Sequence, residues 1–175
     1  QKTTIAEHAL TMIQEGQIIA LDYGSTSQML ALALNKQFQN LTIVTNSIQN
    51  ALILSECPGY TVILTGGILN KNEYTLVDNM TPLMEHLHID TYFMSVSGID
   101  PVVGGTDLGF SEANIQNWMR RAAAKTIVLA DSSKFGRSSL VKVCPVSEVN
   151  CIITDSGLSP EMQAAFSQQS VNLVV

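Results

Sequence analysis

The sequence predicts an α/β fold in which a mostly parallel central sheet is covered by helices on both faces. Two observations lead to this prediction. Short apolar segments rich in β-branched residues alternate with helical segments along the chain, and such alternation is typical of parallel sheets. Most of the short segments are apolar throughout, as expected for strands that are buried on both sides.

Three strands are expected in the first half of the chain. They are QIIALD (17–22), LTIVT (41–45) and YTVILT (60–65). Helices are expected at about 3–15, 26–37, 47–56 and 79–87, one before the first strand and one after each of the three. The helices after the first two strands open with Thr and Ser, whose side chains suit the N-cap position.

Four further strands are expected in the second half. They are IDTYFMSVS (89–97), TIVLAD (126–131), NCIITD (150–155) and VNLVV (171–175). Helices are expected at about 111–124 and 159–168. In the first of these helices, Glu112 lies in the first turn, where an acidic residue favours the helix dipole. Trp118 and Met119 suit either an amphipathic helix packed on the sheet or an oligomer surface.

The composition fits one domain, over residues 1–175, that relies little on charge. Of the 175 residues, 46% are hydrophobic and 14% charged, against about 25% charged in an average soluble domain. We therefore expect oligomer contacts or a polar ligand cleft on the surface. With nine Lys plus Arg and a net charge of −6, the chain lacks the cluster of cations that non-specific binding to nucleic acid requires.

Several chemistries have no motif in the sequence. Cys57, Cys144 and Cys151 show no C-x-x-C spacing, so we expect neither a disulfide framework nor a zinc site, and a reducing cytoplasm as the compartment. His86 and His88 stand two apart, which does not bring helical side chains to one face, and we expect no metal or other cofactor. No apolar run approaches the ~18–20 residues of a membrane span.

Five expected strands end in segments rich in hydroxyls or glycine. In chain order these segments are YGSTS, NS, GG, GID and SSKFG. The carboxyl ends of parallel strands meet at one edge of a sheet, where loops and helix N-termini converge on ligands. A single Ser or Thr in such a loop serves equally well as a helix cap. The recurrence in five loops nevertheless favours a ligand site.

The strongest local pattern is DYGSTS (22–27), between a strand and a helix. Gly24 allows a tight turn, and the hydroxyls of Ser25, Thr26 and Ser27 suit a phosphate, together with the free backbone N–H groups of the helix start. The segment matches neither G-x-x-x-x-G-K-[ST] nor G-x-G-x-x-G, so nucleoside triphosphates and dinucleotides have no motif support. A small monophosphate ester fits it better.

The other strand ends add an acceptor, a cation and turns. Asp100 could accept hydrogen bonds from sugar hydroxyls. Lys134 could neutralise a phosphate or pair with Asp131 or Asp22. The two Gly-Gly pairs permit close backbone approach, although turn geometry alone explains them as well.

Taken in order, these motifs resemble the effector-binding domain of DeoR-family bacterial transcription regulators. The resemblance is carried by IAEHAL, LDYGSTS, LTIVTNS, VILTGG, HIDTYFMSVSGID with a following GGT, LADSSKFG and IITD. It runs from about Ile5 to the C-terminus. It implies a three-layer α/β fold shared with ribose-5-phosphate isomerase, glucosamine-6-phosphate deaminase and CoA transferases.

The resemblance also implies a sensor function instead of catalysis. A phosphorylated sugar or related metabolite would be the effector of a repressor of sugar metabolism, and the domain would form a homodimer or homotetramer without a membrane partner. DNA would be bound only through a winged helix-turn-helix that the family places upstream and that is absent before Gln1. The expected effector site comprises Asp22, Gly24, Ser25, Thr26, Ser27, Thr45, Asn46, Ser47, Thr65, Gly66, Gly67, Gly98, Asp100, Gly105, Glu112 and Lys134.

Two positions depart from the family pattern. The family usually has Lys-Arg fifteen residues before the Asp of its D-x-S-K-F-G motif, whereas counting back from Asp131 gives Gln116 and Asn117. The Arg-Arg pair at 120–121 stands one turn later and could substitute. The family also often has Val-Gly-Pro where this chain has Val-Asp-Asn, and Asp78 would alter the charge of one cleft wall or cap the next helix.

A sugar-phosphate isomerase on the same fold is the alternative function. Relative to the isomerase pattern, Val103 replaces the Lys before Gly-Gly. Ala113 takes the position of the catalytic base, with Glu112 one residue away. Proton abstraction beside a carbonyl needs a base within about 3 Å of the proton. The chain therefore has counterparts for the isomerase's binding segments more than for its catalytic residues.

Overall fold

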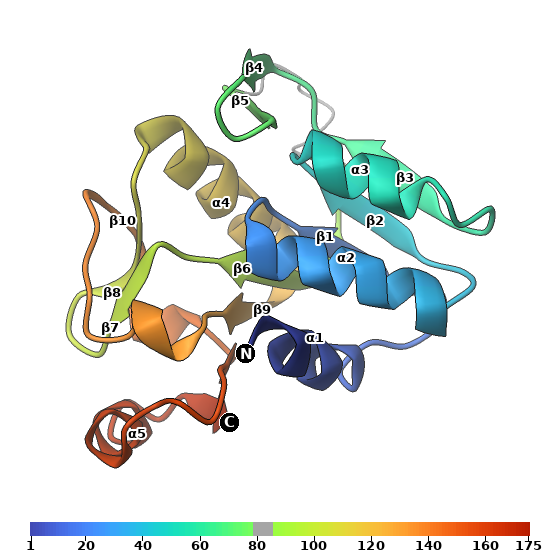
Figure 1. The fold of residues 1–175 in the computed structure, drawn as a ribbon. Helices are drawn as coiled ribbons and strands as arrows, with labels where there is room; N and C mark the ends of the chain where they lie inside the picture. The colour runs from blue at the N-terminus through green and yellow to red at the C-terminus, as the bar shows by residue number, and fades with distance from the viewer. Residues whose placement is uncertain (79–85) are drawn as a thin grey trace.

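The computed structural model describes residues 1–78 and 86–175, and in it a seven-stranded sheet lies between two layers of helices (Figure 1). The three-layer α/β fold that the sequence predicts is therefore confirmed. The helix expected at about 79–87 falls mainly on residues 79–85, which lie outside the described part of the chain.

All seven strands expected from the sequence are confirmed, and every neighbouring pair among them is parallel. The strands are β1 (Ile18–Leu21), β2 (Thr42–Thr45), β3 (Thr61–Leu64), β6 (Ile89–Ser95), β9 (Ala123–Leu129), β11 (Cys151–Ile153) and β12 (Asn172–Val174). The three central strands, β1, β6 and β9, are buried over most of their length. The mainly apolar sequence of these strands thus reflects coverage of the sheet on both faces.

The order of the strands places a reversal in the middle of the sheet. The order is β12-β11-β9-β6-β1-β2-β3. After β1, the next two strands, β2 and β3, are added on one side of β1. The chain then crosses to the other side of β1, where β6, β9, β11 and β12 are added in order. The crevice beyond the carboxyl ends of the strands at such a reversal is where open α/β sheets bind ligands.

Within residues 1–78 and 86–175, three helices cover one face of the sheet. They are α1 (Lys2–Leu10), α2 (Ser25–Gln37) and α3 (Ile48–Leu54). Ile5 of α1 and Leu30 and Leu34 of α2 are fully buried against Ile19 and Phe93 of the sheet. The helices before and after β1 therefore share one hydrophobic core with it.

Helix α1 is shorter than the helix expected at about 3–15. After Leu10 the N–H groups of Met12 and Ile13 bond to carbonyls three residues back, which is the tighter 3₁₀ pattern common at helix ends. The chain then turns through Gly16 and enters β1.

The opposite face is covered by α4 (Phe110–Ala122) and α5 (Pro160–Ser167). Met119 of α4 is fully buried and Trp118 packs against the same core, which confirms the amphipathic-helix interpretation of this pair. Phe166 of α5 stacks edge-on against Phe135, with ring centroids 5.2 Å apart. Two 3₁₀ segments, η2 (Ser132–Lys134) and η3 (Val146–Glu148), complete this layer.

Five short strands were not predicted. They are β4 (Ile68–Asn70) and β5 (Thr75–Val77), which form a ribbon, and β7 (Gly98–Asp100), β8 (Gly104–Asp107) and β10 (Val141–Cys144), which form a small antiparallel sheet. Strand β8 has the sequence GGTD, and all four of its residues are buried. A Cβ at Gly104 would lie 2.1 Å from the Cys144 carbonyl oxygen. The strands of this sheet therefore pack with their backbones close together, and their sequence shows no apolar pattern that would predict them.

No helix of the described residues is long and apolar enough to cross a membrane. Cys57, Cys144 and Cys151 are free thiols. Over residues 1–78 and 86–175, no group of three or more His, Cys, Asp or Glu side chains is arranged to hold a metal ion.

Candidate functional site

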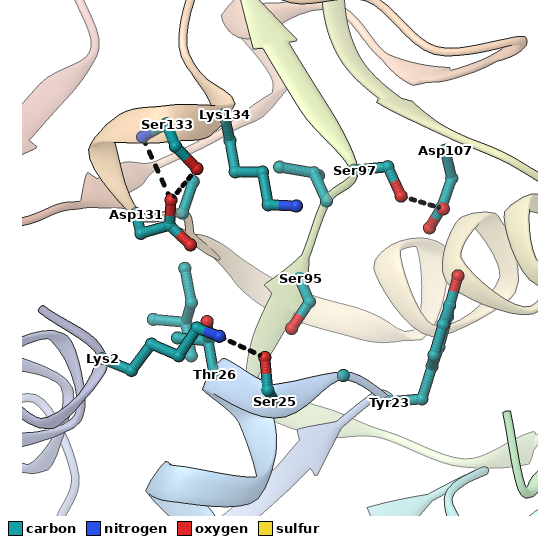
Figure 2. Close-up of a pocket in the computed structure, with 14 residues that line it drawn as sticks. Lys2, Tyr23, Ser25, Thr26, Ser95, Ser97, Asp107, Asp131, Ser133 and Lys134 are labelled. Atoms are coloured by element: carbon teal, nitrogen blue, oxygen red, sulfur yellow. Dashed lines mark hydrogen bonds between the residues drawn. The ribbon is translucent and has the colours of Figure 1, made fainter.

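A cavity of about 310 Å³ lies at the reversal between β1 and β6 (Figure 2). This volume is at the lower end of the range of small-molecule sites. The segments that follow β1, β6 and β9 form most of its wall, and α1 and β8 add one residue each. The lining residues are Lys2, Tyr23, Gly24, Ser25, Thr26, Ser95, Val96, Ser97, Asp107, Leu129, Ala130, Asp131, Ser133 and Lys134.

The segment after β1 presents hydroxyls at the start of α2. Gly24 is the N-cap residue and has a φ of 103°, a left-handed conformation that favours glycine. The carbonyl of Asp22 accepts hydrogen bonds from Ser27 Oγ at 2.9 Å and from Asn50 Nδ2 at 2.7 Å. These contacts fix the turn on the side away from the cavity, so that Ser25 and Thr26 line the cavity.

The segment after β6 positions a carboxylate on the opposite wall. Asp107 of β8 accepts hydrogen bonds from Ser97 Oγ and from the Leu108 N–H, both at 2.7 Å. Gln116 Nε2 donates to its other oxygen at 2.8 Å. Three donors therefore fix the orientation of Asp107, whose lone pairs suit ligand hydroxyls.

The segment after β9 adds a lysine. Asp131 caps η2 by accepting from the Ser133 N–H at 3.0 Å and from the Ser133 hydroxyl. This cap turns the chain so that the Lys134 side chain extends into the cavity, while Lys2 approaches from α1 and donates to Ser25 Oγ at 2.7 Å (Figure 2). Within the described residues, neither lysine forms an ion pair with a carboxylate.

A buried polar cluster lies beneath the cavity. Asp22 is fully buried and accepts hydrogen bonds from Tyr92 Oη at 2.9 Å and from the Ser95 N–H at 3.0 and 2.9 Å. Gln116 Nε2 lies 3.3 Å from Asp22 Oδ2 and also donates to Asp107. Burial raises the pKa of the Asp22 carboxyl to about 8, because desolvation outweighs these hydrogen bonds and the nearby Asp107 charge adds to it.

Gln116 occupies the position where the family pattern has a lysine. Its side chain is almost fully buried, and the amide nitrogen bonds to Asp107 and to the Ser95 carbonyl oxygen. A neutral amide thus joins the two carboxyl groups of Asp22 and Asp107. Among the described residues, no lysine or arginine forms an ion pair with either carboxyl group.

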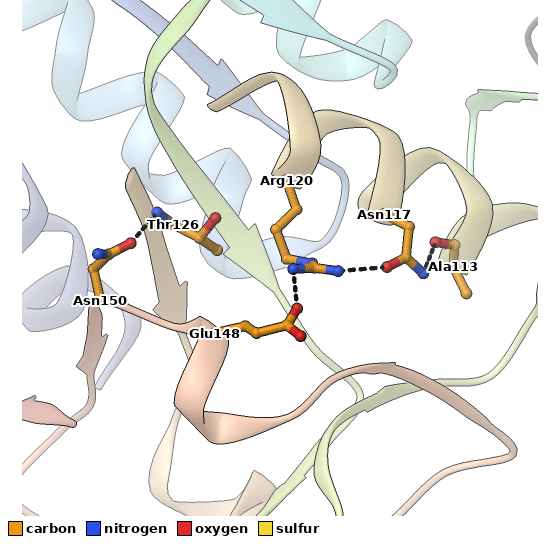
Figure 3. A network of polar contacts seen from close by, with 6 residues as sticks. All are labelled: Ala113, Asn117, Arg120, Thr126, Glu148 and Asn150. Carbon is orange, nitrogen blue, oxygen red and sulfur yellow. Dashed lines mark hydrogen bonds and ion pairs between the residues drawn. The ribbon is translucent and has the colours of Figure 1, made fainter. Parts of the chain in front are cut away.

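The neighbouring Asn117 and Arg120 belong to a different network (Figure 3). Arg120 forms an ion pair with Glu148 and donates to Asn117 Oδ1 at 3.1 Å. Asn117 in turn donates to the Ala113 carbonyl oxygen at 3.0 Å. Arg120 is not among the residues that line the cavity, so it does not replace the missing cation there.

A second cavity of about 340 Å³ adjoins the first. The two share Tyr23 and Ser97 as lining residues. Glu112 lines the second cavity and accepts a hydrogen bond from Asn70 Nδ2 at 2.6 Å. The pKa of the Tyr23 hydroxyl is raised, first by burial and then by the charge of Asp107, so that it remains a neutral hydrogen-bond donor.

The expected site residues divide into two groups. Gly24, Ser25, Thr26 and Lys134 line the first cavity, and Glu112 lines the second. The remaining expected residues line neither of these two cavities: Asp22, Ser27, Thr45, Asn46, Ser47, Thr65, Gly66, Gly67, Gly98, Asp100 and Gly105.

Several of the second group hold the backbone. Asp100 Oδ1 accepts from the N–H groups of Val102 and Val103 at 2.8 and 2.9 Å and so closes the turn between β7 and β8. Ser47 caps α3 by accepting from the Asn50 N–H at 3.2 Å. Turn and cap roles therefore account for these two residues without a ligand.

Sequence reasoning missed several lining residues. They are Lys2, Tyr23, Ser95, Ser97, Asp107 and Ser133. Tyr23 and Ser133 lie inside segments already recognised as polar strand ends, so position alone could have identified them. Asp107 lies on β8, which had no hydrophobic pattern. Lys2 reaches the site only because of the way in which α1 packs on α2.

Nothing in the described cavity walls marks a nucleophilic thiol. Cys144 is buried and its pKa is raised to about 11, mainly by desolvation, so its thiolate is scarce at neutral pH. The wall instead combines two lysines, several hydroxyls and two oriented carboxylates, those of Asp107 and Asp131. Such a set can bind a small anion that also carries hydroxyl groups.

Comparisons with known proteins give a consistent picture. The family model for the DeoR C-terminal sensor domain matches residues 1–156. The chain is 32% identical to the HTH-type transcriptional regulator GolR of Listeria innocua over 95% of its own length and 65% of that protein. It is 29% identical to a putative aga operon transcriptional repressor of Escherichia coli O157:H7, over 99% of the chain and 65% of the repressor.

Two solved structures share the fold. A probable sor operon regulator from Shigella flexneri matches with a TM-score of 0.58 at 12% identity, over 95% of this chain and 87% of that one. Ribose 5-phosphate isomerase A from Neisseria gonorrhoeae matches with a TM-score of 0.59 at 20% identity, over 79% and 54%. The chain thus has the fold of both, and it spans 65% of the length of the two curated relatives above.

Proposed function

Because this chain belongs to the family of DeoR C-terminal sensor domains, we propose that it binds a phosphorylated sugar in the cavity between β1, β6 and β9. The relatives compared above are transcriptional regulators. Sugar phosphate would be the signal, and the preference of the ligand for one arrangement of the domain would alter operator binding by the whole protein. Such coupling requires a difference in affinity between two states.

The distribution of charge in the cavity supports a ligand with an anionic end and a hydroxylated end. Lys2, Lys134 and the hydroxyls of Ser25 and Thr26 lie toward one side, whereas Asp107 and Tyr23 lie toward the other (Figure 2). Asp131 lies on the side of the lysines, where its carboxylate accepts hydrogen bonds from Ser133. Lys134 has no carboxylate partner among the described residues. A phosphate would supply that partner, while Asp107 would accept hydrogen bonds from sugar hydroxyls.

The DNA-binding part of the regulator is proposed to lie outside this chain. Residues 1–175 span about two thirds of the curated relatives, and their net charge is −6. A surface of this charge is unsuited to the phosphate backbone of DNA. We propose that a helix-turn-helix module joined before residue 1 reads the operator, in a homodimer or homotetramer.

Lys134→Gln is expected to weaken binding of the phosphorylated ligand at least about tenfold, since a hydrogen bond to a charged group contributes about 1.5–3 kcal/mol. The measurement is a calorimetric titration of the chain with inorganic phosphate and with a panel of pentose and hexosamine phosphates. Thermal unfolding gives a second readout, because a ligand at 100 times its Kd adds about 2.7 kcal/mol of stability.

Lys142→Gln is the matched control, because Lys142 is exposed on β10 and does not line the cavity. It should leave phosphate affinity unchanged. Binding of unphosphorylated sugars as tightly as their phosphates, or equal affinity in the Lys134 variant, would refute the proposed ligand class.

The isomerase alternative makes a different prediction. Glu112, the carboxylate next to the position of the isomerase base, is hydrogen-bonded to Asn70 in the adjoining cavity. We expect no turnover of ribose 5-phosphate or hexosamine phosphates in a coupled assay. Turnover by the wild-type chain that is lost in Glu112→Gln would establish the enzyme instead of the sensor.

A further inference from the structure

We propose that Lys2 is a ligand contact supplied by α1, so that an anion bound in the cavity holds α1 against the start of α2. This inference rests on the proposed function and adds to it the element that responds to the ligand. Lys2 is the one cavity-lining residue that comes from α1. All the others lie at Tyr23 or later in the chain, in or beyond the first polar loop.

Helix α1 is attached to the rest of the fold by two unlike contacts. Along its apolar side, Ile5, Ala6 and Ala9 are buried against α2. At its first turn, Lys2 Nζ donates a hydrogen bond at 2.7 Å to Oγ of Ser25, which is the first residue of α2. The second contact is a single hydrogen bond between exposed groups, so the part of α1 that precedes the buried Ile5 is held less firmly than the rest of the helix.

The ammonium group of Lys2 lies where an anion would meet it. Figure 2 shows Lys2 and Lys134 extending toward the cavity from opposite sides, one from α1 and one from the loop after β9. In the described residues neither has a carboxylate partner. A phosphate on Ser25 and Thr26 would therefore be bound by both ammonium groups, and the one on α1 would gain a charged partner that it otherwise lacks.

This arrangement couples occupancy to the position of α1. If docking of the first turn raises the affinity for the anion by some factor, the anion raises the docking equilibrium by the same factor. If a DNA-reading module lies before residue 1, as proposed above, α1 is the element between that module and the cavity. The ligand would then act on the module through Lys2.

The test compares Lys2→Gln and Lys2→Arg with the wild-type chain. Inorganic phosphate is titrated calorimetrically, and amide hydrogen exchange of α1 is measured with and without it. We expect Lys2→Gln to weaken phosphate binding about three- to fivefold, as for an exposed charge pair, and Lys2→Arg to restore most of the affinity. Phosphate should slow exchange in α1 of the wild type but not of Lys2→Gln, while α5 remains unchanged in both.

Lys36→Gln is the control for loss of one positive charge, since Lys36 lies on α2 in the separate groove between α1 and α2. Its phosphate affinity should match that of the wild type. If phosphate binds the wild type and Lys2→Gln equally well, or leaves α1 exchange unchanged in the wild type, the role of Lys2 is refuted and the proposed function stands. If phosphate and the sugar phosphates all fail to bind the wild type, both are refuted.

Discussion

Asp22→Ala is expected to lower the free energy of unfolding by about 4 kcal/mol. The variant removes the carboxyl group that accepts from the Tyr92 hydroxyl and from the Ser95 N–H. Each buried donor left without a partner costs about 1–3 kcal/mol.

The measurement is urea unfolding at acidic pH, where the contribution of Asp22 is complete, and Tyr92→Phe provides the control. Tyr92→Phe removes one of the two donors along with its need for an acceptor, so the double variant should lose less stability than the sum of the two single variants. Strict additivity, or a loss below about 1 kcal/mol in Asp22→Ala, would show that this cluster does not support the fold. Phosphate affinity should fall as well, because Asp22 holds the backbone N–H of Ser95 at the cavity wall.

The seven-stranded sheet could be predicted because burial on both faces leaves a strong pattern in the sequence. The segment of β1 is apolar throughout, and five of the seven residues of β6 are buried. Each of these strands is followed by a helix or a polar loop. The small antiparallel sheet left no such pattern. Gly104 and Gly105 lie close to the carbonyl group and the side chain of Cys144, which leaves little room for a larger residue. Glycine has no side chain, so such close packing leaves no hydrophobic pattern in the sequence.

The same distinction holds for the cavity. The hydroxyls after β1 and the lysine after β9 could be predicted because a polar loop after a buried strand marks the edge of a parallel sheet. Asp107 and Ser97 could not, because they meet only through the pairing of β7 with β8. Lys2 depends on the packing angle of α1, which a sequence pattern does not determine. Residues near the strand ends were thus predictable, whereas those brought in by tertiary packing were not.

Many expected site residues instead hold the loops that form the cavity. Ser27 and Asn50 fix the carbonyl of Asp22, and Ser47 caps α3. A hydroxyl at a helix start satisfies a backbone donor whether or not a ligand is present. Sequence alone cannot separate these roles, because both place the same residue types in the same loops.

The stability of this chain is expected to decline between about pH 4 and pH 8 through Asp22. The pKa of its carboxyl is about 8 in the folded state, against the ordinary value of 3.8 for an aspartate side chain. The folded state therefore binds this proton more tightly, and the contribution of Asp22 to stability is complete below pH 3.8 and lost as pH rises toward 8. For one proton the limiting slope is about 1.4 kcal/mol per pH unit.

Gln116→Lys should abolish this decline. The side chain at 116 lies between Asp22 and Asp107, so a cation there would favour both ionised carboxylates and lower the pKa of Asp22 toward its ordinary value. The measurement is urea unfolding at several pH values between 4 and 8.5, compared with Asp22→Asn, in which nothing titrates at this position. The wild-type curve should fall relative to both variants as pH rises.

Asn114→Lys is the matched control, since it adds the same charge to an exposed position of α4. It should keep the decline of the wild type, because solvent screens a charge at that position. If Gln116→Lys and Asn114→Lys have the same pH dependence, a cation at position 116 does not offset the desolvation that raises the pKa of Asp22. If instead Gln116→Lys alone is flat, the residue at position 116 determines whether Asp22 is neutral or ionised beneath the cavity. Phosphate should then bind the wild type more weakly as pH rises through 8, since ionised Asp22 adds a negative charge directly below the cavity.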